Sequence, residues 1–165
     1  MERTELTARV TELHQKYGGL VERRCRTMLG DREAAADAAQ EVFLRLLRSW
    51  EQFRAEASPV TWLYQVTTNI CIDELRRRAR RATAELTPAM EQVLAHGAPS
   101  TEAVVGGRQE LRGLLERLDP EVLQVLVHLH LDGMTQEEIA ATLGVTRKTV
   151  WARLNRVRQL EPRCA

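Results

Sequence analysis

The stretch MTQEEIAATLGVTRKTVWARLNRVRQL, residues 134–160, has the signals of two short helices joined by a tight turn. Thr135 followed three residues later by Glu138 predicts an N-terminal capping box. Gly144 suits the turn because it has no Cβ, and Thr146 is placed to cap the second helix. Apolar residues recur at helical spacing on both sides of the turn. The stretch therefore predicts a helix-turn-helix unit.

The second helix of this unit is basic. Five Lys or Arg and no Asp or Glu lie between Gly144 and Leu160. A basic helix after a glycine turn is able to enter the major groove of DNA and contact phosphates and base edges. We therefore expect duplex DNA binding, and the alternative is a structural hairpin with a solvated basic face. The candidate contacts are Arg147, Lys148, Thr149, Arg153 and Arg156.

The composition predicts an all-α fold. The chain has 165 residues, of which 44% are apolar and only 4% aromatic, and the common residues favour helix. No two-residue hairpin turn lies between alternating apolar runs. The length allows two small helical domains joined by a flexible linker.

Local signals divide the chain into these domains. A first domain is expected over 5–81, with Gly18-Gly19 weakening or bending its first helix, and further helices over 32–52 and 58–81. Asp31 and the pair Ser58-Pro59 are start signals for the last two. Residues 82–108 are rich in Pro and Gly without a sustained apolar stripe, so we expect a linker with a helical turn near 89–95. The second domain, 109–161, contains predicted helices near 109–117, 120–131, 135–143 and 147–160.

Charge is concentrated in two basic blocks, although the net charge is only +1. Residues 74–81 carry five arginines and one glutamate, and the second helix of the helix-turn-helix is the other block. Two separated blocks favour two contacts with a polyanion. Solvated helix ends are the alternative, because arginine near a helix C-terminus also suits the helix dipole.

Nothing in the sequence indicates an enzyme, a cofactor or a metal site. The three cysteines have no zinc-like spacing, and we expect Cys25 and Cys71 to be buried and reduced. A redox role for Cys164 is left open. His128 and His130, two apart on a helix, point in different directions and make a poor metal pair. No signal peptide and no membrane-spanning run is present, so we expect a cytoplasmic protein without membrane insertion.

Two helix faces lie opposite the predicted core. In the helix over 32–52 this face contains one apolar residue, Leu44, which suits a docking surface. In the helix over 58–81 it contains Tyr64, Thr68, Asn69 and Arg76, and such side chains suit extruded bases. A solvated surface is the alternative for both faces.

The segment DAAQEVFLRLLRSWEQFRAEASPVTWLYQVTTNICIDELRRRAR, residues 37–80, resembles the conserved second region of the extracytoplasmic-function sigma factors. These are small RNA polymerase initiation factors of the sigma-70 family. The resemblance is carried by a DxxQExF pattern from Asp37 to Phe43, an FR-x-E-AS connection, and a TWLY-x₄-N run from Thr61 to Asn69. The helix-turn-helix resembles the fourth region of the same family, and the unmatched middle corresponds to its variable linker.

The resemblance implies a role for each site. The DxxQExF helix would dock on the clamp helices of the polymerase β′ subunit through Asp37, Gln40, Glu41, Leu44 and Arg48. The segment from Phe53 to Arg81 would bind the melted minus-ten element, with Asn69 near a flipped base and the loop from Arg54 to Ser58 lining its pocket. The fourth region would read the minus-thirty-five element and dock on the β flap. The minus-ten candidates are Arg54, Ser58, Tyr64, Thr68, Asn69, Arg76 and Arg77.

The sequence thus predicts an alternative sigma factor that binds core RNA polymerase and promoter DNA, with an anti-sigma factor as an implied partner. One departure from the family is the start of the recognition helix, TRKTV, where small residues before the threonine are usual. The first rival is a stand-alone helix-turn-helix regulator, which would leave the two helix faces unused. The second is a helical interaction protein that does not bind DNA.

Overall fold

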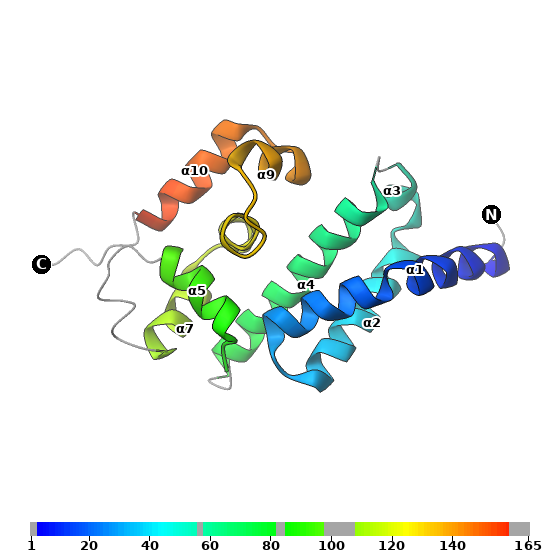
Figure 1. Cartoon of the computed structure of the whole chain (residues 1–165), viewed down its shortest axis with the longest axis horizontal. Helices are drawn as coiled ribbons and strands as arrows, with labels where there is room; N and C mark the ends of the chain where they lie inside the picture. Colours follow the sequence, from blue (N-terminus) through cyan, green and yellow to red (C-terminus); the bar gives the residue numbers. More distant parts are fainter. Residues whose placement is uncertain (1–2, 56–57, 82–84, 98–107, 159–165) are drawn as a thin grey trace, which may run out of the picture. The chain divides into compact units, whose positions relative to one another are not determined.

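The computed structural model describes residues 3–55, 58–81, 85–97 and 108–158. Every regular element of this part of the chain is helical (Figure 1), which confirms the all-α prediction. The chain divides into two compact units, residues 1–71 and 72–165, and the division falls inside α4. Among the described helices, none combines the length and apolar character needed to cross a bilayer.

The N-terminal helices are α1 (Arg3–Leu29), α2 (Arg32–Arg48), α3 (Trp50–Ala55) and α4 (Pro59–Arg80). The α1 helix continues without interruption through Gly18 and Gly19. Asp31 caps α2 as predicted, because its Oδ2 accepts from the backbone N–H of Ala34 at 2.9 Å. Ser49 separates α2 from α3, a break that the sequence does not signal.

The core of the first unit is formed by α1, α2 and α4. Cys25 and Met28 of α1 are fully buried, as are Val42 and Leu46 of α2 and Leu63 of α4. Pairs of apolar residues three or four apart place one stripe of each helix inward. This packing fixes which faces of α2 and α4 remain available to partners.

The C-terminal helices are α5 (Pro88–Gly97), α7 (Arg108–Arg117), α8 (Pro120–Leu126), the π-helical turn η1 (Val127–Leu131), α9 (Gln136–Leu143) and α10 (Arg147–Arg158). The predicted helices near 109–117, 120–131 and 135–143 match these bounds closely. Helix α8 begins at Pro120, where a helix near 120–131 is predicted, and Asp119 is its N-cap residue.

The expected linker contains more structure than a helical turn. Helix α5 runs from Pro88 to Gly97 and buries Met90, Val93 and Leu94. It contacts η1, α7 and α10, all within the second unit. Leu86, just before the helix, is also buried. At least residues 86–97 are therefore part of the packed C-terminal unit.

The turn between α9 and α10 requires a left-handed residue. Gly144 has φ of 65°, and the backbone N–H of Val145 returns to the carbonyl of Ala140 at 3.0 Å. A side chain in this conformation is strained even where space is free.

We expect Gly144→Ala to lower the free energy of unfolding by about 1 kcal/mol, because alanine is strained at positive φ. Gly113→Ala is the matched control, since a Cβ at either glycine meets no atom within 4 Å and Gly113 lies inside α7. The control should be neutral or stabilising. Chemical unfolding of both variants measures the difference, and equal effects would contradict the explanation by backbone strain.

Candidate nucleic-acid interface

The helix-turn-helix has the capping predicted from its sequence. The backbone N–H of Thr135 donates to Glu138 Oε2 at 2.8 Å, and the backbone N–H of Glu138 donates to Thr135 Oγ1 at 3.2 Å. The hydrogen bond from the Thr135 backbone holds the pKa of the Glu138 carboxyl below its usual value. The capping box thus fixes the start of α9.

A small apolar core holds α9 and α10 together. Val125 of α8, Ile139 and Ala140 of α9, and Val150 of α10 are buried in it. The helix axes are set by these contacts because the side chains interdigitate. The α10 helix is therefore presented by α8 and α9 as a fixed element.

The first turn of α10 carries three of the predicted contact residues. Arg147 and Lys148 are exposed, and Arg147 Nε lies 3.0 Å from Glu137 Oε1 on the surface. Thr149 is half-buried, and its backbone N–H donates to Thr146 Oγ1 at 3.1 Å. Thr146 therefore caps the helix as predicted, and Thr149 is held in this cap.

The two later arginines of α10 have protein partners. Arg153 Nη2 donates to Glu121 Oε2 at 2.8 Å, and the Arg153 side chain is only 13% exposed. Arg156 Nη1 donates to Asp119 Oδ2 at 3.3 Å, and both side chains of this pair are exposed. Arg153 therefore connects α10 to α8, and it is poorly placed for DNA.

We expect Arg153→Ala to lower the free energy of unfolding by about 1 kcal/mol, because it removes a mostly buried stem and its bond to Glu121. Its effect on the salt dependence of duplex binding should be small. Lys148→Ala is the comparison, and it should reduce the slope of log K against log salt by about one if Lys148 meets a phosphate. Titrations at several salt concentrations distinguish the two, and a reduced slope for Arg153→Ala would contradict this assignment.

The start of α4 is positioned by three aromatic rings. Phe53 lies 5.4 Å from Trp50 and 5.2 Å from Trp62 between ring centroids, the second pair edge to face. Ser58 Oγ accepts from the backbone N–H of Thr61 at 3.3 Å and so caps α4 as predicted. The side chain of Arg54 lies outside the described residues. The aromatic cluster fixes both ends of the predicted pocket loop.

Thr68 lies in the core, so its expected surface position is wrong. It is fully buried, and its Oγ1 accepts from Nε and Nη2 of Arg24 at 2.9 and 2.8 Å. The same guanidinium lies over the ring of Tyr64, 4.3 Å from the centroid. A buried arginine of α1 therefore determines how Tyr64 is held on α4, and Thr68 is removed from the proposed DNA surface.

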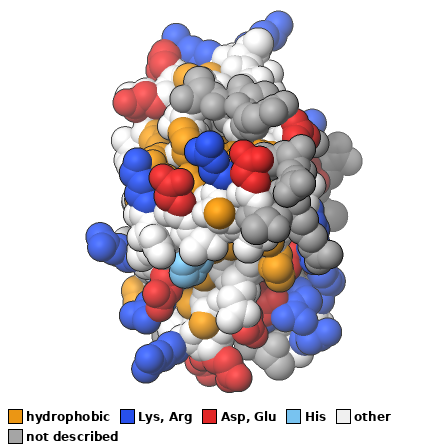
Figure 2. Space-filling view, turned by 90° about the vertical axis from the view of Figure 1, so that its right-hand side faces the viewer, with side chains coloured by type: hydrophobic (Ala, Val, Ile, Leu, Met, Phe, Trp, Pro, Cys, Tyr) orange, Lys and Arg blue, Asp and Glu red, His pale blue; other side chains and the backbone are white. Residues whose placement is uncertain are grey.

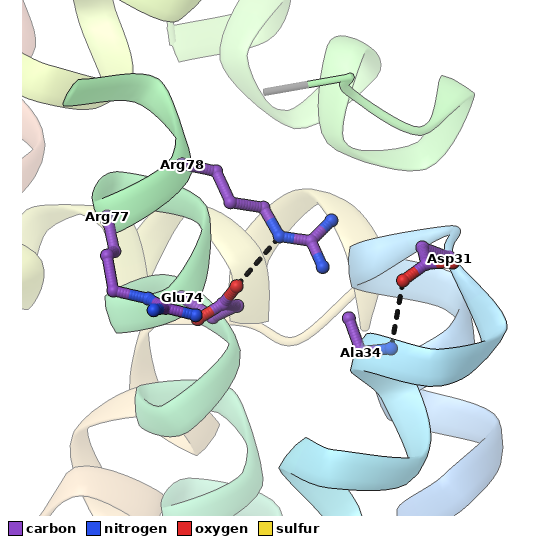
Figure 3. A network of polar contacts seen from close by, with 5 residues as sticks. All are labelled: Asp31, Ala34, Glu74, Arg77 and Arg78. Atoms are coloured by element: carbon purple, nitrogen blue, oxygen red, sulfur yellow. Dashed lines mark hydrogen bonds and ion pairs between the residues drawn. The ribbon is translucent and has the colours of Figure 1, made fainter. Parts of the chain in front are cut away.

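The remaining predicted residues of α4 differ in their partners. Asn69 is half-buried. Glu74 lies between two arginines and bonds Arg77 Nε at 2.8 Å and Arg78 Nε at 2.8 Å (Figure 3). Partial burial raises the pKa of the Glu74 carboxyl, but the hydrogen bonds and charges of Arg78 and Arg77 lower it more, so this pKa lies below its usual value. Arg76 is half-buried, and Arg77 stays exposed.

The predicted docking face of α2 is exposed. Asp37, Gln40 and Arg48 are exposed and Glu41 is partly so, with Arg48 Nη1 3.2 Å from Glu41 Oε1. Leu44, at the centre of this face, is 45% exposed. Phe43 is buried and packs edge to face on His14, with centroids 4.6 Å apart. An apolar residue surrounded by polar ones is the pattern of a protein contact.

Charged side chains of both signs share the surface. Figure 2 shows Lys and Arg side chains together with Asp and Glu side chains on the face it presents. This distribution agrees with the net charge of +1.

Two cysteines and two histidines that the sequence raises as candidate metal or redox sites contact other side chains of the protein. Cys25 and Cys71 are buried free thiols, as predicted, and a hydrogen bond from Cys71 lowers the pKa of Cys25. His128 is buried with its Nδ1 2.8 Å from Asp132 Oδ2, whereas His130 stacks on His96. Within the described residues, no group of three or more metal-ligating side chains is assembled. Cys164 lies outside them.

Two residues of this interface are absent from the sequence prediction. Arg24 was missed because its partner Thr68 is 44 positions away. Trp151 is 58% exposed on α10. Its position one turn after Arg147 could have placed it among the candidate contacts, but those were chosen mainly by charge.

Two family models match most of the chain. Residues 13–81 match sigma-70 region 2, and residues 108–160 match sigma-70 region 4. The region 2 match contains the aromatic cluster and the α2 face, and the region 4 match contains the helix-turn-helix.

Several proteins with similar sequences are named as RNA polymerase sigma factors. The ECF RNA polymerase sigma factor SigE of Mycolicibacterium smegmatis is 33% identical over 154 residues, 90% of this chain and 58% of that protein. SigW of Bacillus subtilis is 29% identical over 87% of this chain and 81% of its own length. The ECF RNA polymerase sigma-E factor of Haemophilus influenzae is 29% identical over 92% and 82%. The chain thus spans somewhat more than half of the first of these relatives and about four fifths of the other two.

Proposed function

The chain belongs to the extracytoplasmic-function sigma factors of the sigma-70 family, and we propose that it joins core RNA polymerase and directs it to promoters with two separated elements. The observation that carries this proposal is the presence of both regions in one chain, region 2 at 13–81 and region 4 at 108–160. A stand-alone helix-turn-helix regulator needs only the second. The chain is therefore not of that class.

Each step of the proposed activity uses one described surface. The exposed face of α2, with Leu44 at its centre, would dock on the β′ clamp helices. The α4 face with Tyr64 and Asn69 would hold unstacked bases, because an aromatic ring and an amide suit stacking and edge recognition. The α10 helix would enter the major groove of the upstream element, and region 4 would dock on the β flap.

The domain limits and further partners belong to this proposal as well. We assign core binding and the minus-ten element to 5–81 and the minus-thirty-five element to 109–161. Family membership supports an anti-sigma factor as a partner of the free protein, and the cytosol as its compartment. Purification of the full chain from its own cells tests for the anti-sigma factor, which should co-purify with the chain and be displaced by core polymerase.

The test of the function is transcription in vitro. Purified core RNA polymerase, with and without this chain, is given a library of promoter fragments. New start sites that share two spaced motifs support the proposal. Duplex binding without any binding to core polymerase would refute it.

We expect Asn69→Ala to slow open-complex formation about tenfold, since one base-edge interaction is worth roughly that factor. Affinity for core polymerase should not change, because Asn69 lies on α4 and the proposed docking face lies on α2. Permanganate footprinting of melted thymines and a core-binding titration measure the two effects. If Asn69→Ala lowers open-complex formation and core affinity to the same extent, the variant misfolds in region 2 and the result does not support a role of Asn69 in base capture.

A further inference from the structure

The exposed face of α10 has an aromatic residue at its centre. Trp151 is 58% exposed, and it is one of three large apolar side chains found exposed in the described part of the chain. Burying an indole side chain in a partner releases much apolar surface from water. An indole exposed on the outward face of α10 is available to a partner.

The inward and outward faces of α10 are sharply separated. Val150 and Val157 are buried, and Arg153 between them is bonded to α8. These positions are three or four apart and define the inward stripe. The outward face therefore contains Lys148, Trp151, Ala152 and, half-buried beside them, Asn155.

The chemistry of this face fits duplex DNA. From Arg147 to Arg158 the helix has no acidic residue, and Arg147 and Lys148 are exposed at its first turn. The N-terminal part of the second helix is the part that a helix-turn-helix brings to the base edges. The C5-methyl of thymine is the apolar group that the major groove displays. An exposed indole between basic residues suits that group better than it suits a phosphate.

We propose that Trp151 is a specificity-determining residue that packs on the C5-methyl of a thymine in the upstream promoter element, a proposal that rests on the proposed function. The contact is apolar, so it contributes sequence preference without adding to the salt dependence. Arg147 and Lys148, about one turn before it on α10, supply phosphate contacts. Arg153, which is only 13% exposed and bonds to Glu121, is not a base reader in this arrangement.

The first experiment finds the thymine. Holoenzyme made with the full chain selects binding sites from a promoter library randomised over the upstream element, and the selection is repeated with Trp151→Ala and Trp151→Phe. Wild type should enrich thymine at one position, Trp151→Ala should lose that preference alone, and Trp151→Phe should keep most of it. Melting of the variants should be unchanged because the side chain is exposed.

The second experiment removes only the methyl group. Deoxyuridine replaces the selected thymine, which leaves every hydrogen-bonding group of the base pair in place. Wild-type affinity should fall about fourfold, the value expected for one buried methyl group. The affinity of Trp151→Ala should not change. Asn155→Ala is the control variant, and it should respond to deoxyuridine as the wild type does.

The outcomes separate this proposal from the function on which it rests. If wild type selects an upstream motif and Trp151→Ala selects the same motif, Trp151 does not read DNA and the proposal is overturned. Loss of core affinity or of preference at every position in Trp151→Ala would overturn it too, by pointing to a protein partner or to misfolding. If wild type selects no motif, the sigma-factor function itself fails.

Discussion

We expect Thr68→Val to lower the free energy of unfolding by about 2–4 kcal/mol, although valine nearly matches threonine in shape. The Thr68 hydroxyl accepts two hydrogen bonds from the buried guanidinium of Arg24, at 2.9 and 2.8 Å. Valine removes the acceptor of both of these hydrogen bonds from the buried cation. Removing a hydrogen bond from a buried charged group costs more free energy than the net value of an ordinary hydrogen bond, because the group has already been removed from water.

The neighbouring residue provides a matched control. Thr67 is also fully buried, but its hydroxyl donates to the backbone carbonyl of Leu63 at 2.6 Å. Thr67→Val should lower stability by about 1 kcal/mol or less, because a neutral back-bond within a helix contributes little. Chemical unfolding of both variants measures the difference. If the two variants lower the free energy of unfolding equally, the loss is a general effect of replacing a buried threonine by valine and does not depend on Arg24.

A double-mutant cycle separates the pair from its surroundings. Arg24→Met with Thr68→Val removes both the cation and its acceptor, so the double variant should be less destabilised than the sum of the single ones. We expect a coupling of about 1–3 kcal/mol. Because Arg24 also lies over the Tyr64 ring, Arg24→Met should loosen that ring even where stability is recovered.

We expect Leu44→Asp to weaken binding to core RNA polymerase about 30-fold, the effect of losing one central interface residue. Leu44 is 45% exposed on α2, among polar residues that the resemblance assigns to the β′ clamp helices. A carboxylate there must be desolvated when the partner covers it. Stability should change by less than about 0.5 kcal/mol, since the residue already contacts water.

Val60→Asp is the comparison for this prediction. Val60 is an exposed apolar residue of α4 in the same unit, and it does not belong to the α2 face. Its affinity for core polymerase should stay near that of the wild type. Fluorescence anisotropy with labelled chain and purified core enzyme measures both affinities. Equal weakening by the two variants would show that added negative charge, and not loss of an α2 contact, causes the effect.

Local signals predict most of the helix boundaries correctly. Asp31, Ser58 and Thr135 each cap the helix that follows them, and Gly144 takes the positive φ of the turn. In each case the capping group and the backbone it satisfies are within four residues. Sequence patterns contain this information because the energy that decides the boundary is local.

The features that sequence reasoning missed depend on distant residues. By helical spacing Thr68 falls on a polar face, and only the contact with Arg24 shows that it is buried. The apolar stripe of α5 is too short for its full length to be predicted without the helices that pack on it. The break at Ser49 lets Trp50 and Phe53 form the aromatic cluster with Trp62. The hydrogen bond of Arg153 to Glu121, which precedes it by 32 positions, is likewise not visible in the local sequence.

Helix α10 keeps its stabilising contacts and its outward residues on different faces. Val150, Arg153 and Val157 attach it to the unit, whereas Lys148 and Trp151 face away from that core. Changes at the outward positions should therefore leave the fold intact. If these positions read the promoter as proposed, promoter preference is free to diverge between duplicated copies of such a gene without a period of instability. The same separation allows engineers to build sets of mutually insulated variants, each of which switches on its own promoter inside one cell.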